Sequence, residues 1–379
     1  MKRLLSAALA ALLLFSLAPL ASANEALDVT AQAAVLMERD TGRVLYEKNP
    51  HEKLPPASVT KVMGLLLIVE AIDEGRIALT DTVTTSDHAS SMGGSQIFLS
   101  PGEKMSVEDM LKSVVVSSAN DAIVALGEHI AGSEAAFVSA MNHRAIALGM
   151  NDTTFKNASG LDEPGHVTSA YDIALMSREL LLYPLIKEYT TIWMDSVRGG
   201  DFQLANTNKL IRSYPGATGL KTGYTSVAKY CLAGSAERDG MELVCGILGA
   251  PTSNDRFDAA KMLLDYGFAN YTLVALYPPE ALAPVDVMLG EAPFVQPVLS
   301  DDNKLLVDKS DAGRLVKEVV LQESVEAPVE RGQKLGEMIV SVEETELSRI
   351  AILASDEVPR LTLPKLFSRF LRTLFMADG

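Results

Sequence analysis

The chain has 379 residues, of which 48% are hydrophobic and 22% charged; this composition excludes a disordered protein, and the length suggests two domains. Its net charge of −16 would repel phosphate backbones, which makes nucleic acid a poor candidate partner. With only Cys231 and Cys245 present, disulfides are not the main scaffold. A bond between these two residues stays open as an alternative to the two buried free thiols that we expect.

The N-terminus predicts an export signal. A basic start precedes an apolar run from Leu4 to Leu20, and the small residues Ala21-Ser22-Ala23 follow. The run is too short and too interrupted for a membrane-spanning helix. We therefore expect residues 1–23 to be a signal peptide and the mature chain to work outside the cytoplasm.

Residues 33–46 predict a β-hairpin, and a buried helix follows it. The helix is expected to begin at Ser58, after two prolines, and to end at Asp73. It is apolar on nearly every side, which is typical of a helix in a domain core. Ser58 and Lys61 would lie one turn apart on one face. Because burial disfavours a charged lysine, this pair would set a base beside a nucleophile.

The Ser-x-x-Lys pattern is weak evidence by itself. It is short enough to arise by chance, and Ser226 and Lys229 form it a second time in this chain. The second copy falls in a segment expected to belong to a sheet rather than to a buried helix.

A second candidate feature is a break between two predicted helices. Residues 80–86 predict a short strand and residues 88–95 a loop of the kind that borders sites. A helix with a capping box at Ser106 should then stop near Ser117, and another should begin at Ala122. Ser118 and Asn120 lie on the break, where they either face a cleft or simply cap the second helix.

Two residues in the following segment are expected to be structural. Residues 133–190 continue as helices with a loop at 157–161. His166 has no carboxylate partner fixed by the sequence, so we expect a surface histidine rather than a general base. Trp193, the only tryptophan, is expected to pack rather than to bind substrate.

A third feature is the segment Lys221-Thr222-Gly223, which precedes two strands predicted at 228–236 and 241–248. The lysine supplies positive charge, the threonine hydroxyl binds an anion, and the glycine lets a bound peptide approach the strand. The alternative is a turn with an incidental lysine.

The three features, in this order, resemble those of the penicillin-binding proteins and serine β-lactamases over most of residues 33–271. The resemblance is closest to the low-molecular-mass D-alanyl-D-alanine carboxypeptidases. It is carried by residues 56–61, 118–122, 157–161 and 219–223. It implies an α+β fold of the β-lactamase/transpeptidase type, an antiparallel sheet flanked by helices, over residues 24–275. It implies no cofactor and no metal.

The resemblance also implies an acyl-transfer mechanism on peptidoglycan stem peptides that end in D-Ala-D-Ala, with β-lactam antibiotics as further ligands. Ser58 would attack the terminal peptide bond, Lys61 would take its proton, and Ser118 would pass that proton to the leaving D-alanine. The implied substrate-binding residues are Asn120, Lys221, Thr222, Gly223, Tyr224 and Arg256. The N–H groups of Ser58 and Tyr224 would form an oxyanion hole.

Several alternatives stay open. Many family members have histidine at the position of Tyr224, and Arg256 is either a carboxylate ligand or a surface ion pair. A β-lactamase, a DD-endopeptidase and a homologue that only binds wall peptides all fit the same motifs. No Glu-x-x-x-Asn loop lies between Asn120 and Lys221, so fast release of a penicillin acyl group is not expected.

The remaining chain predicts a small domain and an anchor. Short apolar runs alternate with turns over residues 276–358, which is typical of an all-β domain. Residues 359–379 predict an amphipathic helix, with Lys365, Arg369 and Arg372 opposite an apolar face. That face consists of Leu363, Leu366, Phe367, Phe370, Leu371, Leu374 and Phe375. We expect it to bind the outer face of the cytoplasmic membrane; the alternative is docking on the β domain.

Overall fold

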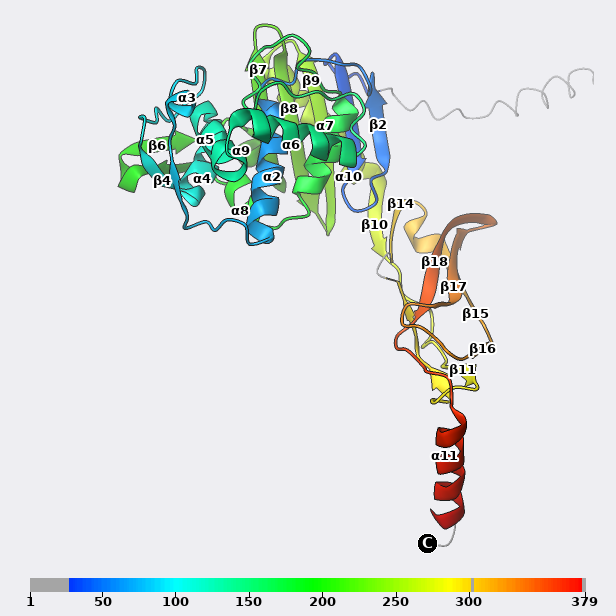
Figure 1. The fold of residues 1–379 in the computed structure, drawn as a ribbon. Helices are drawn as coiled ribbons and strands as arrows, with labels where there is room; N and C mark the ends of the chain where they lie inside the picture. Colours follow the sequence, from blue (N-terminus) through cyan, green and yellow to red (C-terminus); the bar gives the residue numbers. More distant parts are fainter. Residues whose placement is uncertain (1–26, 301–302, 377–379) are drawn as a thin grey trace, which may run out of the picture.

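The computed structural model describes residues 27–300 and 303–376 (Figure 1). The expected signal peptide, residues 1–23, lies outside the described residues. A helical and sheet-containing N-terminal domain, residues 27–270, is followed by a narrow C-terminal domain, residues 271–362, and a helix extends from the far end of the latter. Across the described ranges, no helix combines the length and apolar character needed to cross a membrane.

The N-terminal domain is built on a five-stranded antiparallel sheet with the order β2-β1-β9-β8-β7. The strands are β1 (Ala33–Glu38), β2 (Val44–Lys48), β7 (Ala217–Thr225), β8 (Lys229–Arg238) and β9 (Met241–Ala250). The expected hairpins at 33–46 and 228–248 are confirmed. Successive residues of β1 alternate between two apolar cores, one on each face of the sheet, because side chains of a strand point to opposite faces.

Helices cover both faces. One core contains α10 (Ser253–Asn270), and the other contains most of the remaining helices. These are α2 (Lys61–Asp73), α4 (Val107–Ser117), α5 (Asn120–Ala131), α6 (Glu134–Ala147), α7 (Ala170–Leu180) and α8 (Leu185–Thr190). The one-turn helix α9 (Leu210–Ser213) contributes Leu210 to the core that contains α10. Two small hairpins lie at the edge, β3 (Thr82–Thr84) with β4 (Lys104–Ser106) and β5 (Met194–Val197) with β6 (Phe202–Ala205).

Two local expectations need correction. The helix expected from Ser58 begins instead with a 3₁₀ turn, η1 (Ala57–Thr60), and becomes α-helical at Lys61. The loop expected at 88–95 begins with a one-turn helix, α3 (Asp87–Ser90), because the Ser86 hydroxyl accepts the N–H of Ala89 and caps it.

His166 is buried, and the expected surface position is wrong. Its Nδ1 accepts the backbone N–H of Lys156 at 3.1 Å, so Nε2 carries the proton and donates to Thr60 Oγ1 at 2.8 Å. The expectation of a surface position assumed that a buried histidine would need a carboxylate partner. In the structure, a backbone amide and a threonine hydroxyl form the hydrogen bonds of both ring nitrogens. Burial lowers the pKa of His166 to about 4.

Two other sequence expectations are confirmed. Cys231 and Cys245 are buried free thiols, and burial raises the pKa of both, to about 11 for Cys231 and about 12 for Cys245. Trp193 packs beneath the guanidinium of Arg212, which lies 5.0 Å from the centre of the ring.

The C-terminal domain is all-β, as expected. A four-stranded sheet, β13-β18-β17-β15, lies with a three-stranded sheet, β12-β11-β16, and a pair, β10-β14. The strands are β10 (Tyr271–Ala275), β11 (Val285–Met288), β12 (Phe294–Val295), β13 (Pro297–Leu299), β14 (Lys304–Asp308), β15 (Leu315–Leu321), β16 (Ser324–Glu326), β17 (Lys334–Val342) and β18 (Thr345–Ala354). The domain boundary expected after residue 275 falls at the end of β10. Because β10 pairs with β14, a strand of the C-terminal domain, β10 is assigned to that domain.

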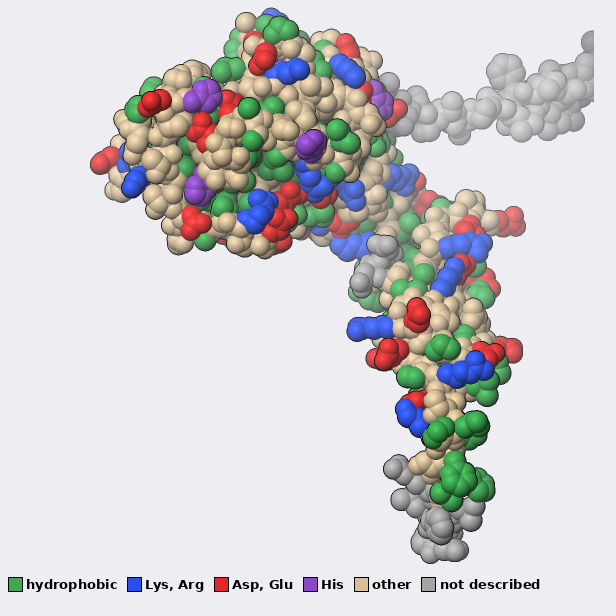
Figure 2. Space-filling model, viewed as in Figure 1, with side chains coloured by type: hydrophobic (Ala, Val, Ile, Leu, Met, Phe, Trp, Pro, Cys, Tyr) green, Lys and Arg blue, Asp and Glu red, His purple; other side chains and the backbone are tan. Residues whose placement is uncertain are grey.

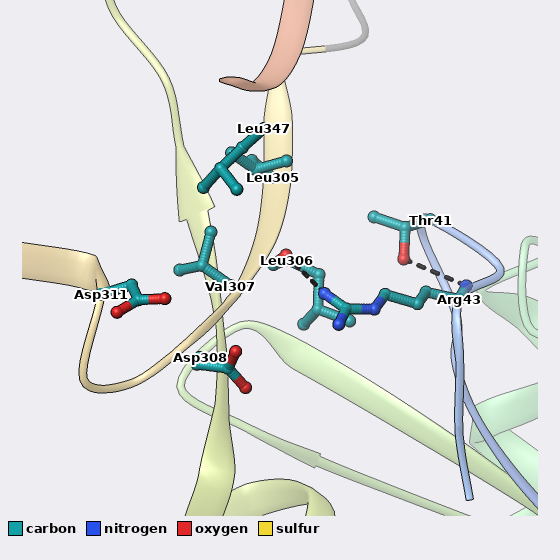
Figure 3. Close-up of a pocket in the computed structure, with 8 residues that line it drawn as sticks. All are labelled: Thr41, Arg43, Leu305, Leu306, Val307, Asp308, Asp311 and Leu347. Atoms are coloured by element: carbon teal, nitrogen blue, oxygen red, sulfur yellow. Dashed lines mark hydrogen bonds between the residues drawn. The ribbon is translucent and has the colours of Figure 1, made fainter. Parts of the chain in front are cut away.

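The two domains meet at the turn between β1 and β2 (Figure 3). Asp40 in that turn forms an ion pair with Lys304 at 2.5 Å, and Arg43 donates to the Leu306 carbonyl at 3.3 Å. A cavity of about 280 Å³ lies between the turn and β14. The last element, α11 (Leu363–Met376), extends away from the C-terminal domain (Figure 1), and the described apolar side chains of this helix are exposed.

Gly246 on β9 tests how closely the sheet and α7 approach. A methyl group there would lie 2.3 Å from the Ala170 carbonyl oxygen, closer than any real contact. We expect Gly246→Ala to destabilise the N-terminal domain by about 1–3 kcal/mol, because backbone must move. Urea unfolding followed by Trp193 fluorescence measures this. Gly93→Ala is the control, because a methyl group at Gly93 would have no atom within 4 Å. Equal urea midpoints for the Gly246 and Gly93 variants would contradict the close packing of β9 on α7.

His166 predicts an acid-sensitive stability. The unfolded histidine binds its proton near pH 6.5, and the folded one only near pH 4, so the unfolded state holds more protons between these values. Stability should therefore fall as the pH drops through this window, by up to about 3 kcal/mol. His166→Gln should unfold with a smaller difference between pH 7 and pH 4.5 than the wild type. The exposed His143, changed to Gln, is the control; an unchanged pH dependence in His166→Gln would contradict the assignment.

Candidate active site

The N-terminal residue of α2, Lys61, is the centre of the site. Its side chain is fully buried, and its Nζ lies 2.9 Å from Ser58 Oγ, 2.6 Å from Asn120 Oδ1 and 2.6 Å from the carbonyl oxygen of Ser159. Three segments far apart in the sequence therefore converge on one amine. Ser58 itself, in η1, is half-buried and so is reachable from solvent.

The electrostatics of this amine favour the neutral form. Burial lowers the pKa of Lys61 well below its ordinary value, the nearby charge of Lys221 lowers it further, and Asp121 opposes the shift. Lys221 is also fully buried, and burial with the neighbouring Arg256 lowers its pKa to about 7. Both lysines are fully buried, and the charge of Lys221 disfavours a charge on Lys61.

The break between α4 and α5 forms one wall. Ser118 ends α4 in a left-handed conformation, φ 63°, and is buried. Asn120 begins α5, and its amide bridges the site because Oδ1 accepts from Lys61 while Nδ2 donates to the Gly93 carbonyl at 2.6 Å. The buried carboxylate of Asp121 accepts the N–H groups of Ile97 and Leu99. These hydrogen bonds hold the loop that follows α3 against the break between the two helices. The sequence predicted a loop at residues 88–95 that borders the site.

A second wall is the loop 157–161. Gly160 has φ 85°, and a methyl group on it would lie 1.9 Å from the Ala57 carbonyl oxygen, so only glycine fits here. This contact holds the Ser159 carbonyl against Lys61. The family resemblance includes residues 157–161 but implies no function for Ser159. The acceptor is a backbone oxygen, which no residue-type pattern reveals.

The third wall is β7, the edge strand of the sheet. Lys221, Thr222 and Gly223 lie within this strand, and Lys221 Nζ donates to the Thr222 carbonyl at 3.0 Å. Thr222 Oγ1 donates to Thr207 Oγ1 at 2.6 Å. An edge strand leaves backbone groups that an extended peptide can pair with.

Gly223 also has a packing function that the sequence did not indicate. A methyl group on it would lie 2.8 Å from the Pro56 carbonyl oxygen and 3.0 Å from the Ser58 nitrogen. The glycine therefore allows η1 to approach β7. Peptide binding next to Gly223 stays a prediction.

Arg256 on α10 is buried, so the alternative of a surface ion pair is wrong. Its guanidinium donates to the carbonyls of Gly223 at 2.9 Å and Cys231 at 3.4 Å, and lies 4.7 Å from the centre of the Phe257 ring. Burial lowers its pKa to about 10. The side chain is thus hydrogen-bonded to the backbone of β7 and places a positive charge near Lys221.

The other candidate residues are arranged differently. Tyr224 is exposed at the rim, with its ring 4.4 Å from that of Tyr230. In the second Ser-x-x-Lys copy, Ser226 is exposed in the turn before β8 and Lys229 is exposed at the first position of that strand. In the described part of the chain, no group of three or more His, Cys, Asp or Glu residues is placed to hold a metal ion.

Comparisons with known proteins identify the family of both domains. A family model described as D-alanyl-D-alanine carboxypeptidase matches residues 20–252, and one described as penicillin-binding protein 5, C-terminal domain, matches residues 271–360. The interval between the two matches corresponds to α10. D-alanyl-D-alanine carboxypeptidase DacF of Bacillus subtilis is 43% identical over 371 residues, which cover 95% of each chain.

Solved structures show the same similarity. Penicillin binding protein 5 from Haemophilus influenzae superposes with a TM-score of 0.78 at 29% identity, covering 88% of this chain and 98% of its own. Penicillin-Binding Protein D2 from Listeria monocytogenes, in its ampicillin-bound form, superposes with a TM-score of 0.59 at 34% identity, covering 64% of this chain and 99% of its own. The matches cover both domains, and the chain belongs to the D-alanyl-D-alanine carboxypeptidases, which are serine hydrolases of peptidase family S11.

Proposed function

We propose that this carboxypeptidase removes the terminal D-alanine from peptidoglycan pentapeptide stems through an acyl-enzyme formed on Ser58. The observation that carries the proposal is the set of contacts around Lys61 Nζ. A neutral amine has two N–H groups and one lone pair. The carbonyl oxygens of Asn120 and Ser159 accept both N–H groups at 2.6 Å, which leaves the lone pair for the hydroxyl of Ser58 at 2.9 Å.

In this arrangement Lys61 is the general base. The proton of Ser58 Oγ moves to Lys61 Nζ while Oγ forms a bond to the carbonyl carbon of the D-Ala-D-Ala peptide. The peptide C–N bond then breaks, Ser118 donates its proton to the leaving amine of D-alanine, and Lys61 returns its extra proton to Ser118. Water hydrolyses the remaining ester and restores Ser58. The low proton affinity of Lys61 supports this role, because a protonated lysine has no lone pair to accept with.

Substrate recognition is proposed to use β7 and its surroundings. Lys221 and Thr222 bind the terminal carboxylate, supported by the positive charge of the buried Arg256. Asn120 holds both Lys61 and the substrate amide. The N–H groups of Ser58 and Tyr224 stabilise the oxyanion, and the close contact of Gly223 with the Ser58 turn supports their pairing.

β-Lactam antibiotics are proposed to acylate the same serine, as the ampicillin-bound relative suggests. A β-lactamase is not favoured, since no Glu-x-x-x-Asn loop lies between the break and β7. A DD-endopeptidase would use the same residues on a different stem peptide, and assays with cross-linked and uncross-linked stems distinguish the two.

The cell envelope is the place of action that the substrate implies. We propose that residues 1–23 direct export and that α11 binds the outer face of the cytoplasmic membrane. The described apolar side chains of α11 are exposed rather than packed on the C-terminal domain, which supports a membrane as their partner.

Ser58→Ala tests the nucleophile. Intact-protein mass spectrometry with benzylpenicillin should show one stable adduct on the wild type and none on Ser58→Ala. Release of D-alanine from a peptide ending in D-Ala-D-Ala should fall at least about a thousandfold, because the acyl-enzyme route is lost. Ser226→Ala, in the exposed copy of the motif, should keep both activities. An adduct on Ser58→Ala, or rapid penicillin turnover without any adduct, would contradict the proposal.

Removal of residues 363–379 tests the anchor. Without α11, the protein should no longer sediment with vesicles that contain phosphatidylglycerol, since the exposed apolar face and its basic residues are gone. The truncated protein should still release D-alanine, which shows that it is folded. Sedimentation equal to that of the full chain would contradict an anchoring function of α11.

A further inference from the structure

The tip of the C-terminal domain carries three large apolar side chains that are each more than half exposed. Met288, Leu289 and Phe294 of the β11–β12 hairpin are 53%, 57% and 54% exposed. Phe294 pairs with Asp286, two residues before Met288, so Met288 and Phe294 lie on one face of the hairpin. We call these three residues the apolar tip.

Leu289 is held outward at a cost. Its φ of 58° is left-handed, a conformation that glycine and asparagine adopt easily and leucine does not. A large apolar side chain in an exposed, strained position is unfavourable in water unless a partner covers it. Exposed apolar clusters of this kind mark protein or membrane contacts.

The position of the tip identifies the partner. The Leu361 N–H donates to the Leu289 carbonyl at 2.8 Å, and α11 begins two residues later, at Leu363. Two residues span at most about 7 Å, so the apolar tip lies beside the first apolar residue of α11. Figure 2 shows hydrophobic side chains gathered at this lower end of the molecule.

Two carboxylates beside the tip are held in ion pairs. Glu326, which pairs with Met288 in the sheet, forms an ion pair with Arg360 at 3.0 Å. Glu291 forms one with Lys365, in the first turn of α11, at 2.5 Å. Both carboxylates would otherwise repel an anionic lipid surface. Asp286 lies further from α11 along the hairpin and marks the limit of the apolar surface.

We infer that the apolar tip is a second membrane contact, which inserts into the lipid interface beside α11 and seats the C-terminal domain on the bilayer. The inference rests on the proposed anchoring by α11, because that helix brings the tip to the membrane. The C-terminal domain is then held at the bilayer by two contacts, α11 and the apolar tip, rather than by α11 alone.

Site-specific labelling tests this in the full chain. Because Cys231 and Cys245 are fully buried, an environment-sensitive dye reacts with an introduced exposed cysteine. Dye on Leu289→Cys should shift to the blue when phosphatidylglycerol vesicles are added. Dye on Val316→Cys, on β15 and 57% exposed, is the control for an equally exposed apolar site and should not shift. Dye on Leu366→Cys reports α11.

The outcomes separate the two contacts. A shift at Leu366→Cys without one at Leu289→Cys overturns the tip contact and leaves the anchor intact. No shift at either position overturns both. A shift at Leu289→Cys that needs no vesicles and grows with protein concentration identifies a second copy of the chain as the partner, and this also overturns the inference.

A second measurement uses affinity. Leu289→Ser combined with Phe294→Ser should lower the vesicle partition constant by roughly tenfold or more, since two large side chains no longer leave water on binding. Val316→Ser should not change it. Both variants should release D-alanine like the wild type, because the substitutions lie outside the N-terminal domain. An unchanged partition constant in the double variant overturns the inference.

Discussion

The burial of one lysine amine is the constraint on which the site depends. Lys61 can serve as the proposed base only if it is neutral, and a neutral amine is favoured by a dry environment next to another positive charge. A buried amine also needs hydrogen-bond acceptors, because unsatisfied polar groups in a core are costly. The carbonyl oxygens of Asn120 and Ser159 supply them, and the Ser58 hydroxyl lies next to the remaining lone pair, so the turn, the break and the loop must all meet at one point.

Small residues make that meeting possible. Gly160 and Gly223 let the loop and β7 approach the Ser58 turn so closely that a methyl group at either position would collide with backbone. The side chain of Asp121 and the guanidinium of Arg256 then fix the surrounding backbone through hydrogen bonds. The proposed catalytic groups therefore lie on parts of the chain that have little freedom to move, which is what preorganised acyl-transfer chemistry requires.

The C-terminal domain separates the active site from the proposed membrane contacts. Asp40 and Lys304 join it to the sheet of the N-terminal domain at one end, while the apolar tip and α11 mark the other. If both contacts bind lipid, the active site is held away from the membrane by the length of the β domain.

The sequence by itself determined much of this protein. Local patterns predicted the hairpins, the Ser58 helix, the break at Ser118, the all-β domain and the amphipathic tail, because periodicity, caps and turns are short-range effects. Tertiary structure alone decided the rest. The Ser159 carbonyl, the burial of His166 and of Arg256, and the reason for Gly223 depend on contacts between segments far apart in the chain. Residue type does not encode which backbone atom will face a buried amine; packing does.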